Sequence, residues 1–226
     1  MAAVRPLLGF CLAVGLWIAA GLGLPGVAHA ADDGDLFGAR SVRSGNMAAF
    51  PRWTGMLERY FKGTDPMSRV CKGDVFRRCM SEEWKTFLEG IAGDDPMTKI
   101  RKVNAEMNRA RYTLDMTNYG EADYWATPYQ FFKMDGDCED YSIAKFLSLR
   151  ALGFDNDSLR VVILDDLNLR VAHAILVVTL DGTQYVLDNQ IAQVVPASSI
   201  HHYKPIYSLN EASWWLYRPK PAAPAG

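Results

Sequence analysis

The stretch Met134-Asp135-Gly136-Asp137-Cys138-Glu139-Asp140-Tyr141 sets one cysteine among four carboxylates. Apolar residues recur at helical spacing from there to Leu152, and Gly153 is a typical C-terminal stop, so the sequence predicts a helix over 138–152. Cys138 then lies at a helix N-terminus, where unpaired backbone N–H groups favour a thiolate. The surrounding carboxylates oppose that thiolate, so either the cysteine is inert or the acids have another task.

The first thirty residues are typical of a secretory signal. Arg5 supplies a positive charge near the N-terminus, and the stretch from Leu7 to Leu24 is largely apolar. The sequence Ala28-His29-Ala30 has small residues at its first and third positions, as at a signal cleavage site. Glycine and proline residues interrupt the apolar run just before this site, which favours a cleaved signal over a retained membrane anchor. We therefore expect cleavage after Ala30 and a mature chain that is not an integral membrane protein.

The mature chain is nearly neutral. Removing residues 1–30 takes away Arg5 and no acidic residue, so 24 basic and 26 acidic residues become 23 and 26, a net charge of −3. It has no long basic run and no interleaving of basic and aromatic residues, which argues against nucleic acid as a partner. We expect one domain over residues 31–218 and a disordered, proline-rich tail at 219–226.

Three cysteines remain after signal cleavage, namely Cys71, Cys79 and Cys138. An odd number of thiols in an oxidising compartment needs a role or a partner for one of them. Cys71 and Cys79 flank a turn-like insert, and the sequence leaves open whether they form a disulfide. A disulfide between them would leave Cys138 free.

The N-terminal half reads as helical after an extended arm over residues 31–46. Aromatic and apolar residues at three- and four-residue spacings predict a helix over 50–61. Ser81 is placed to cap a second helix, and Asp95-Pro96 starts a third that runs to about Tyr112. Residues 118–133 are rich in aromatic side chains and predict a loop that leads into the cysteine helix.

Strands follow the cysteine helix. Residues 159–164, 172–180 and 183–188 are apolar or β-branched, and Asp181-Gly182 predicts a two-residue hairpin between the last two strands. In that register Leu180 pairs with Thr183. His173 and Asp188 then point to the same face of the sheet as diagonal neighbours, roughly 7 Å apart at Cα. A slip of one residue would separate them onto opposite faces.

Cys138, His173 and Asp188 together match the residue types of a thiolate, imidazole and carboxylate triad. In such a site the histidine takes the thiol proton and later protonates the leaving amine, while the aspartate fixes the histidine tautomer. The backbone N–H of Cys138 is the expected oxyanion donor. A buried structural cysteine and a hydrogen-bonded histidine remain the alternative from spacing alone.

Three stretches resemble the bacterial transglutaminase-like cysteine proteases: residues 123–128, residues 136–145, which contain Gly-Asp-Cys-Glu-Asp-Tyr, and residues 186–189. The resemblance extends from about Leu36 to Trp215. It implies an α+β, papain-like and transglutaminase-like fold, in which a helical N-terminal part and the nucleophile helix pack on an antiparallel sheet. The best-known members are periplasmic LapG-type enzymes that clip a large surface adhesin and so control biofilm release.

The resemblance also implies a calcium ion, with Asp137 and Glu139 at the ligand positions and Asp140 as a further candidate. Carboxylate oxygens suit this hard cation. Capping of the helix by Asp137 and first-turn charge at Asp140 remain alternatives. Members of the family are held by an inner-membrane cyclic di-GMP receptor, so such a partner is implied here.

Two rival functions stay open. The same triad would serve a protein acyltransferase, in which an amine rather than water resolves the thioester. A non-catalytic, calcium-binding scaffold would need no nucleophile at Cys138. For Trp125, lining a substrate groove, supporting the oxyanion and packing are equally compatible with the sequence.

Overall fold

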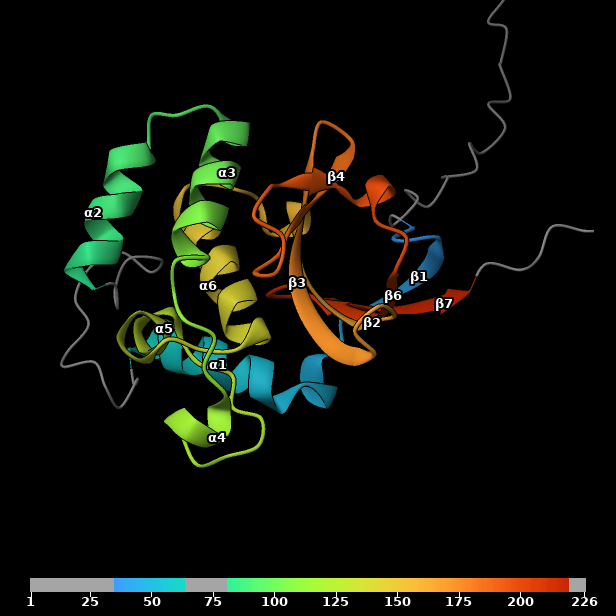
Figure 1. The fold of residues 1–226 in the computed structure, drawn as a ribbon, viewed down its shortest axis with the longest axis horizontal. Coiled ribbons are helices and arrows are strands. Elements are labelled where there is room, and N and C mark those ends of the chain that lie inside the picture. The colour runs from blue at the N-terminus through green and yellow to red at the C-terminus, as the bar shows by residue number, and fades with distance from the viewer. Residues whose placement is uncertain (1–34, 64–80, 220–226) are drawn as a thin grey trace, which may run out of the picture. The chain divides into compact units, whose positions relative to one another are not determined.

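The computed structural model describes residues 35–63 and 81–219 (Figure 1). The expected signal, Cys71, Cys79 and residues 220–226 lie outside the described residues. The helices are α1 (Pro51–Lys62), α2 (Glu82–Ile91), α3 (Pro96–Met107), α4 (Asp115–Asn118), α5 (Pro128–Met134) and α6 (Cys138–Ala151). The strands are β1 (Ala39–Ser44), β2 (Leu159–Asp166), β3 (Val171–Leu180), β4 (Thr183–Leu187), β5 (Val195–Pro196), β6 (Tyr203–Leu209) and β7 (Trp214–Pro219).

The strands form one antiparallel sheet in the order β1-β7-β6-β2-β3-β4-β5. The helices gather on one side of it, and α6 lies between α3 and β3 (Figure 1). This arrangement confirms the predicted α+β fold with the cysteine helix on an antiparallel sheet. In the described ranges no helix is long and apolar enough to span a membrane.

Helix α6 is the centre of the larger hydrophobic core. Every residue from Asp140 to Leu149 is buried, and its apolar side chains pack with those of α1, α2 and α3 and with the sheet. Trp84 of α2 contacts this helix directly, since its indole Nε1 donates a 2.8 Å hydrogen bond to Ser148 Oγ. Burial on all sides gives the first turn of α6, and hence Cys138, a fixed position in the fold.

A smaller core covers the other face of the sheet. Alternate residues of β2 and β3, such as Val162 and Ile175, join Trp215 and Tyr217 of β7 in this second cluster. The alternation follows from the two-residue period of a strand. Both faces of the central strands are therefore buried, which explains why the sequence shows continuous apolar runs there.

The predicted hairpin register is confirmed. Leu180 pairs with Thr183 and Leu176 with Leu187, and Asp181 and Gly182 at the tip both have positive φ. Positive φ at both central residues is the requirement of the turn that the Asp-Gly pair predicted. The ladder ends at Leu187, so the chain leaves the sheet at Asp188.

Four expectations need correction. The third helix ends at Met107 instead of Tyr112, and the supposed aromatic loop contains α5. The start of α5 was recognisable, because Thr127 and Gln130 form a capping box before and after Pro128. The extended arm contains β1, whose residues pair with β7, and Pro219 belongs to β7 instead of the tail.

Candidate active site

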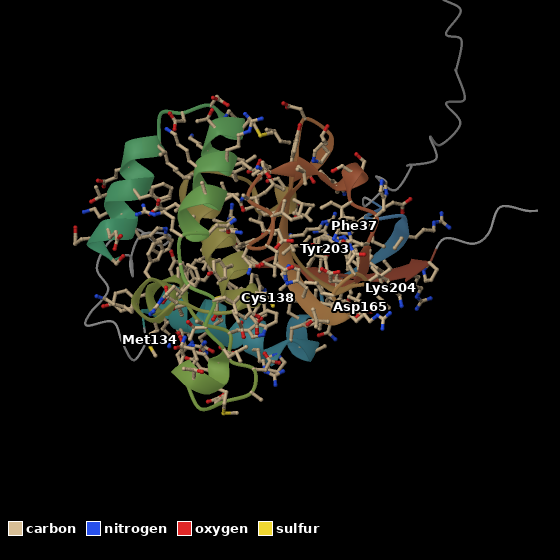
Figure 2. All side chains as sticks on the ribbon, viewed as in Figure 1. Phe37, Met134, Cys138, Asp165, Tyr203 and Lys204 are labelled. Carbon is tan, nitrogen blue, oxygen red and sulfur yellow. The ribbon has the colours of Figure 1, made fainter. Side chains whose placement is uncertain are left out.

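Cys138 is the first residue of α6, and its side chain faces the sheet region near His173. Its Sγ donates a 3.2 Å hydrogen bond to Glu139 Oε2, and the backbone N–H of Ala174 on β3 points at the sulfur. Burial, followed by the charge and hydrogen bond of Glu139, holds the pKa of the thiol far above its usual range. The resting thiol is therefore protonated. Figure 2 labels Cys138 at this helix end and Tyr203 on the sheet.

His173 and Asp188 form a buried, hydrogen-bonded pair, as the predicted register required. His173 Nε2 lies 2.9 Å from Asp188 Oδ1, and the two residues are 3% and 1% exposed. Because an ionised carboxylate only accepts, Nε2 carries the proton and Nδ1 is free to act as the base. Among the described residues, no hydrogen bond joins Cys138 to His173, so the thiol must turn away from Glu139 to reach the imidazole.

Asp188 is held by donors that the sequence did not reveal. Tyr203 Oη donates to Asp188 Oδ2 at 2.5 Å, and the Gln190 N–H donates to Oδ1 at 2.8 Å. Burial alone would raise the pKa of Asp188, but hydrogen bonding and charge from His173 and the bonds from Gln190 and Tyr203 bring it below its usual value. Asp188 is thus ionised at neutral pH and fixes the imidazole.

Lys145 places a buried amine in this region. It lies two turns after Cys138 on α6, it is 1% exposed, and its Nζ is 5.8 Å from the centroid of the Tyr141 ring. Burial lowers the pKa of Lys145 to about 7, and the charge of Asp188 opposes that shift. No sequence pattern marked Lys145, because it occupies an ordinary helical position.

The acidic residues next to Cys138 lie close to Asp115, at the start of α4, and to Asp123, in the loop after that helix. Ligand atoms of Asp115, Asp137 and Asp140 lie within 4.8 Å of one another, as do those of Asp115, Asp123 and Glu139. Of the three predicted metal residues, Asp137 shares one group with Asp140 and another with Glu139, whereas no group of the described residues contains both Glu139 and Asp140. Asp115 and Asp123 were missed, because they precede the cysteine by more than a dozen residues and carry no local signal.

Three carboxylates of the cluster keep a buried oxygen without a hydrogen-bond partner: Asp115 Oδ1, Asp137 Oδ1 and Asp140 Oδ2. Burial raises the pKa of Asp115 to about 6 and, together with Glu139, raises the pKa of Asp137 to about 8. It also raises the pKa of Asp140 well above its usual value. Buried oxygens that lack donors and repel one another fit a hard cation such as calcium.

The structure also shows whether Asp137 caps α6. Asp137 occupies the N-cap position, but its side chain makes no capping hydrogen bond. Asp140 Oδ1 accepts the Ala126 N–H at 2.8 Å, and Asp115 Oδ2 accepts the Tyr124 N–H at 2.6 Å. Both donors are backbone N–H groups outside α6, so these bonds do not cap the helix. Helix capping is therefore not the role of Asp137.

Asp135, which no pattern explained, holds the turn before Cys138. It has a positive φ of 61°, and its carboxylate accepts the Arg111 N–H at 3.1 Å and Arg111 Nε at 3.2 Å. The next residue, Gly136, lies so close to Asp140 that a Cβ atom would be 2.4 Å from Asp140 Oδ2 and 2.6 Å from its Cβ. Only glycine fits between this turn and the acid cluster.

Replacing Gly136 with alanine is expected to lower the free energy of unfolding by about 1–3 kcal/mol, because the buried Asp140 cannot move aside. Gly90 in α2 is the matched control, since a Cβ there meets nothing within 4 Å. Gly90→Ala should stabilise the helix by about 0.5–1 kcal/mol. Denaturant unfolding of both variants measures the two effects. Equal stability of Gly136→Ala and the wild type would contradict the close approach.

Trp125 is largely buried, and its indole N–H already donates a hydrogen bond. Its indole Nε1 donates a 2.9 Å hydrogen bond to Asp123 Oδ1, and its ring lies edge-on to Trp53 with the centroids 6.1 Å apart. The residue is 7% exposed. Packing and orientation of Asp123 account for Trp125, which leaves no N–H for an oxyanion.

A protonatable thiol at a helix N-terminus beside a buried histidine–carboxylate pair on an antiparallel sheet defines the class of papain-like cysteine hydrolases. Comparison with known proteins gives the particular family. The family model described as bacterial transglutaminase-like cysteine proteinase matches residues 70–217, and the chain belongs to this family of cysteine proteases.

Solved structures agree with this assignment. The chain is similar to Legionella pneumophila LapG, with 28% identity, a TM-score of 0.55 and coverage of 71% of this chain and 87% of that one. An EGTA-treated form of that protein has 28% sequence identity and a TM-score of 0.55, and the match covers 71% of this chain and 84% of that one. A calcium-bound form gives 29% identity, a TM-score of 0.55 and 87% coverage of that chain. Curated protein sequences gave no significant match.

Proposed function

We propose that Cys138, His173 and Asp188 are the catalytic triad of this cysteine protease and that it acts as an endopeptidase. The observation that carries the proposal is the buried His173–Asp188 pair at 2.9 Å, next to a thiol at the start of α6. Catalytic hydrogen bonds of this kind often close only when substrate binds.

In the proposed reaction His173 Nδ1 removes the proton from the Cys138 thiol, and the sulfur attacks the scissile carbonyl carbon. Collapse of the tetrahedral intermediate breaks the C–N bond, and the imidazolium gives its proton to the leaving amine. Water, deprotonated by the same imidazole, then hydrolyses the thioester and restores the thiol. Asp188 stabilises the imidazolium throughout, held in place by Tyr203 and Gln190.

A calcium ion is the proposed cofactor. Asp137, Glu139 and Asp140 would hold it as the family resemblance implies, and Asp115 joins them because of its unpartnered oxygen in the same cluster. Bound there, the ion would supply positive charge beside the thiol and offset the carboxylates that raise its pKa. The calcium-bound form of the similar Legionella pneumophila LapG supports this proposal.

The proposed substrate is the membrane-proximal region of a large surface adhesin, whose cleavage controls biofilm release. We further propose a periplasmic location for the domain of residues 31–218 and regulation by an inner-membrane cyclic di-GMP receptor. The family resemblance and the similarity to Legionella pneumophila LapG support these proposals, together with the signal expected over residues 1–30. An adhesin gene next to that of this protein would strengthen the substrate assignment.

Hydrolysis and acyl transfer are separated by one experiment. When the protein is incubated with an adhesin fragment and a labelled primary amine, we expect cleaved fragments with a new N-terminus and no label in the substrate. Both reactions pass through a thioester at Cys138 and differ in what resolves it. Mass spectrometry of the products gives the answer. Incorporation of the amine without chain cleavage would show an acyltransferase instead of a protease.

A further inference from the structure

Helix α3 holds the segment that carries Asp188 at the point where the sheet ceases to hold it. The ladder between β3 and β4 ends at Leu187, so the carbonyl of Asp188 has no strand partner. Asn108, at the C-terminal end of α3, takes that place, because its Nδ2 donates a 2.8 Å hydrogen bond to Asp188 O. One turn earlier on α3, Asn104 Nδ2 donates to Ala192 O at 3.2 Å.

The chain just after α3 is fastened to the turn before the nucleophile. The helix itself lies along α6 (Figure 1). Thr113 N donates a 2.9 Å hydrogen bond to Gly136 O, and a parallel bridge pairs Tyr112 with Gly136. Residues 108–113 therefore connect the loop of Asp188 with the start of α6.

The free energy of folding alone does not account for an amide at position 108. Each of the two asparagines donates one hydrogen bond, but Asn104 Oδ1 and Asn108 Oδ1 are buried without a hydrogen-bond partner among the described residues. A buried acceptor that has lost its water and gained no donor destabilises the folded state, which offsets part of what the donated bond contributes. The position of the group that the amide holds is therefore the better explanation.

We propose that Asn108 is a positioning residue of the triad, whose side-chain amide holds the main chain of Asp188 and thereby places the imidazole of His173 relative to the thiol. The inference rests on the proposed function, in which Cys138, His173 and Asp188 are the triad. Asn108 acts through Asp188, whose carboxylate fixes the imidazole by the 2.9 Å hydrogen bond. A shift of the Asp188 main chain would carry that bond with it, and a misplacement of about 1 Å between reacting groups can cost about 100-fold in rate.

Placement from outside matters at this site because the thiol and the imidazole do not hold each other. In the described part of the chain, Cys138 Sγ is bonded to Glu139, and His173 to Asp188. Proton transfer needs the two groups at hydrogen-bond distance, so it depends on how accurately α6 and the loop after β4 are placed. Residues 108–113 join these two parts of the structure.

The test compares Asn108→Leu with Asn104→Leu in the protein with calcium present. Each variant removes one amide that donates to the main chain of the same loop, so the two unfolding temperatures should fall by similar, small amounts. Only the amide of Asn108 holds Asp188. In Asn108→Leu we expect acylation of Cys138 by p-nitrophenyl acetate, which forms a thioester and releases p-nitrophenolate, to slow by about 10- to 100-fold. In Asn104→Leu the acylation rate should stay close to that of the wild type.

A spectroscopic signal reports the placement of Asp188 without any reaction. The Nε2 proton between His173 and Asp188 is buried, so it should exchange slowly with water and give a separate downfield signal in proton NMR spectra. We expect this signal to shift or disappear in Asn108→Leu and to be retained in Asn104→Leu.

An unchanged acylation rate or an unchanged NMR signal in Asn108→Leu would overturn the proposal. Equal slowing in both variants would also overturn it, because it would show a loosening of the whole loop. If Asn108→Leu does not fold, Asn108→Ser, which removes the amide without adding an apolar side chain, takes its place in both measurements. If Cys138→Ala were acylated as fast as the wild type, the proposed function itself would fail, while the NMR signal would still test the placement of Asp188.

Discussion

Replacing Cys138 with alanine is expected to abolish cleavage of an adhesin fragment, with a loss of about 10⁴-fold or more in kcat. Cys138 is the only cysteine among the described residues, so no other thiol there can replace it as the nucleophile. The folded state should persist, because the substitution removes one sulfur atom, whose side-chain hydrogen bond goes to Glu139. Release of fragments over time, followed by gel electrophoresis, measures the loss.

Asp188→Asn is the companion variant, and it should lower kcat by about 10²–10⁴-fold. An asparagine cannot accept from His173, Gln190 and Tyr203 with both ends of its side chain, so the imidazole loses its fixed tautomer. His201→Ala is the control, because His201 is exposed and lies outside the site. Full activity of Cys138→Ala would support the non-catalytic scaffold and contradict the protease.

Removal of calcium by EGTA is expected to lower the unfolding temperature strongly. At a calcium concentration about 100 times Kd, binding contributes about 2.7 kcal/mol, which corresponds to roughly 5–10 °C for a domain of this size. The reason is the cluster of buried carboxylate oxygens that have no donor of their own. Differential scanning calorimetry with calcium and with EGTA measures the difference.

The calcium effect should also grow with pH. Without the ion, Asp115 and Asp137 have pKa values of about 6 and about 8 in the folded state. Unfolded aspartates titrate near 4, so between roughly pH 4 and 8 the folded state binds more protons. The stability of the calcium-free protein is therefore lost as pH rises through this window. Calcium should restore most of it at the alkaline end.

Two aspartate variants test which carboxylates hold the ion. Asp140→Asn keeps the acceptor for the Ala126 N–H but loses the charge, so the increase in unfolding temperature on adding calcium should be lost. Asp135→Asn is the control, because that carboxylate binds Arg111 outside the cluster, and its calcium response should be intact. A wild-type calcium response in Asp140→Asn would refute this ligand assignment.

The parts of the site that sequence could predict depend on local rules. The Asp181-Gly182 turn fixed the register of β3 and β4, and that register placed His173 and Asp188 on one face. Helical spacing and Gly153 gave α6 to within one residue at its C-terminus. In each case the signal lies within the element itself or in the turn beside it.

The missed parts depend on long-range packing. Tyr203 reaches Asp188 from β6, and β6 had no clear strand pattern because it begins after an irregular segment. Asp115 joins the acids of α6 only because residues 110–113 run beside Gly136. Neither contact follows from periodicity. The capping box at Thr127 is different, since this signal was present in the sequence and was overlooked.

The shared start of α6 has a consequence for engineering the protein. Cys138 and the acids Asp137, Glu139 and Asp140 occupy consecutive positions, and each residue advances a helix by about 100°. An insertion or deletion of one residue here would rotate the thiol and the carboxylates relative to each other and disrupt both. A cation-independent variant must therefore be made by isosteric exchange at fixed length, as from aspartate to asparagine. The length of the segment from Asp137 to Asp140 is therefore constrained by both the thiol and the carboxylates.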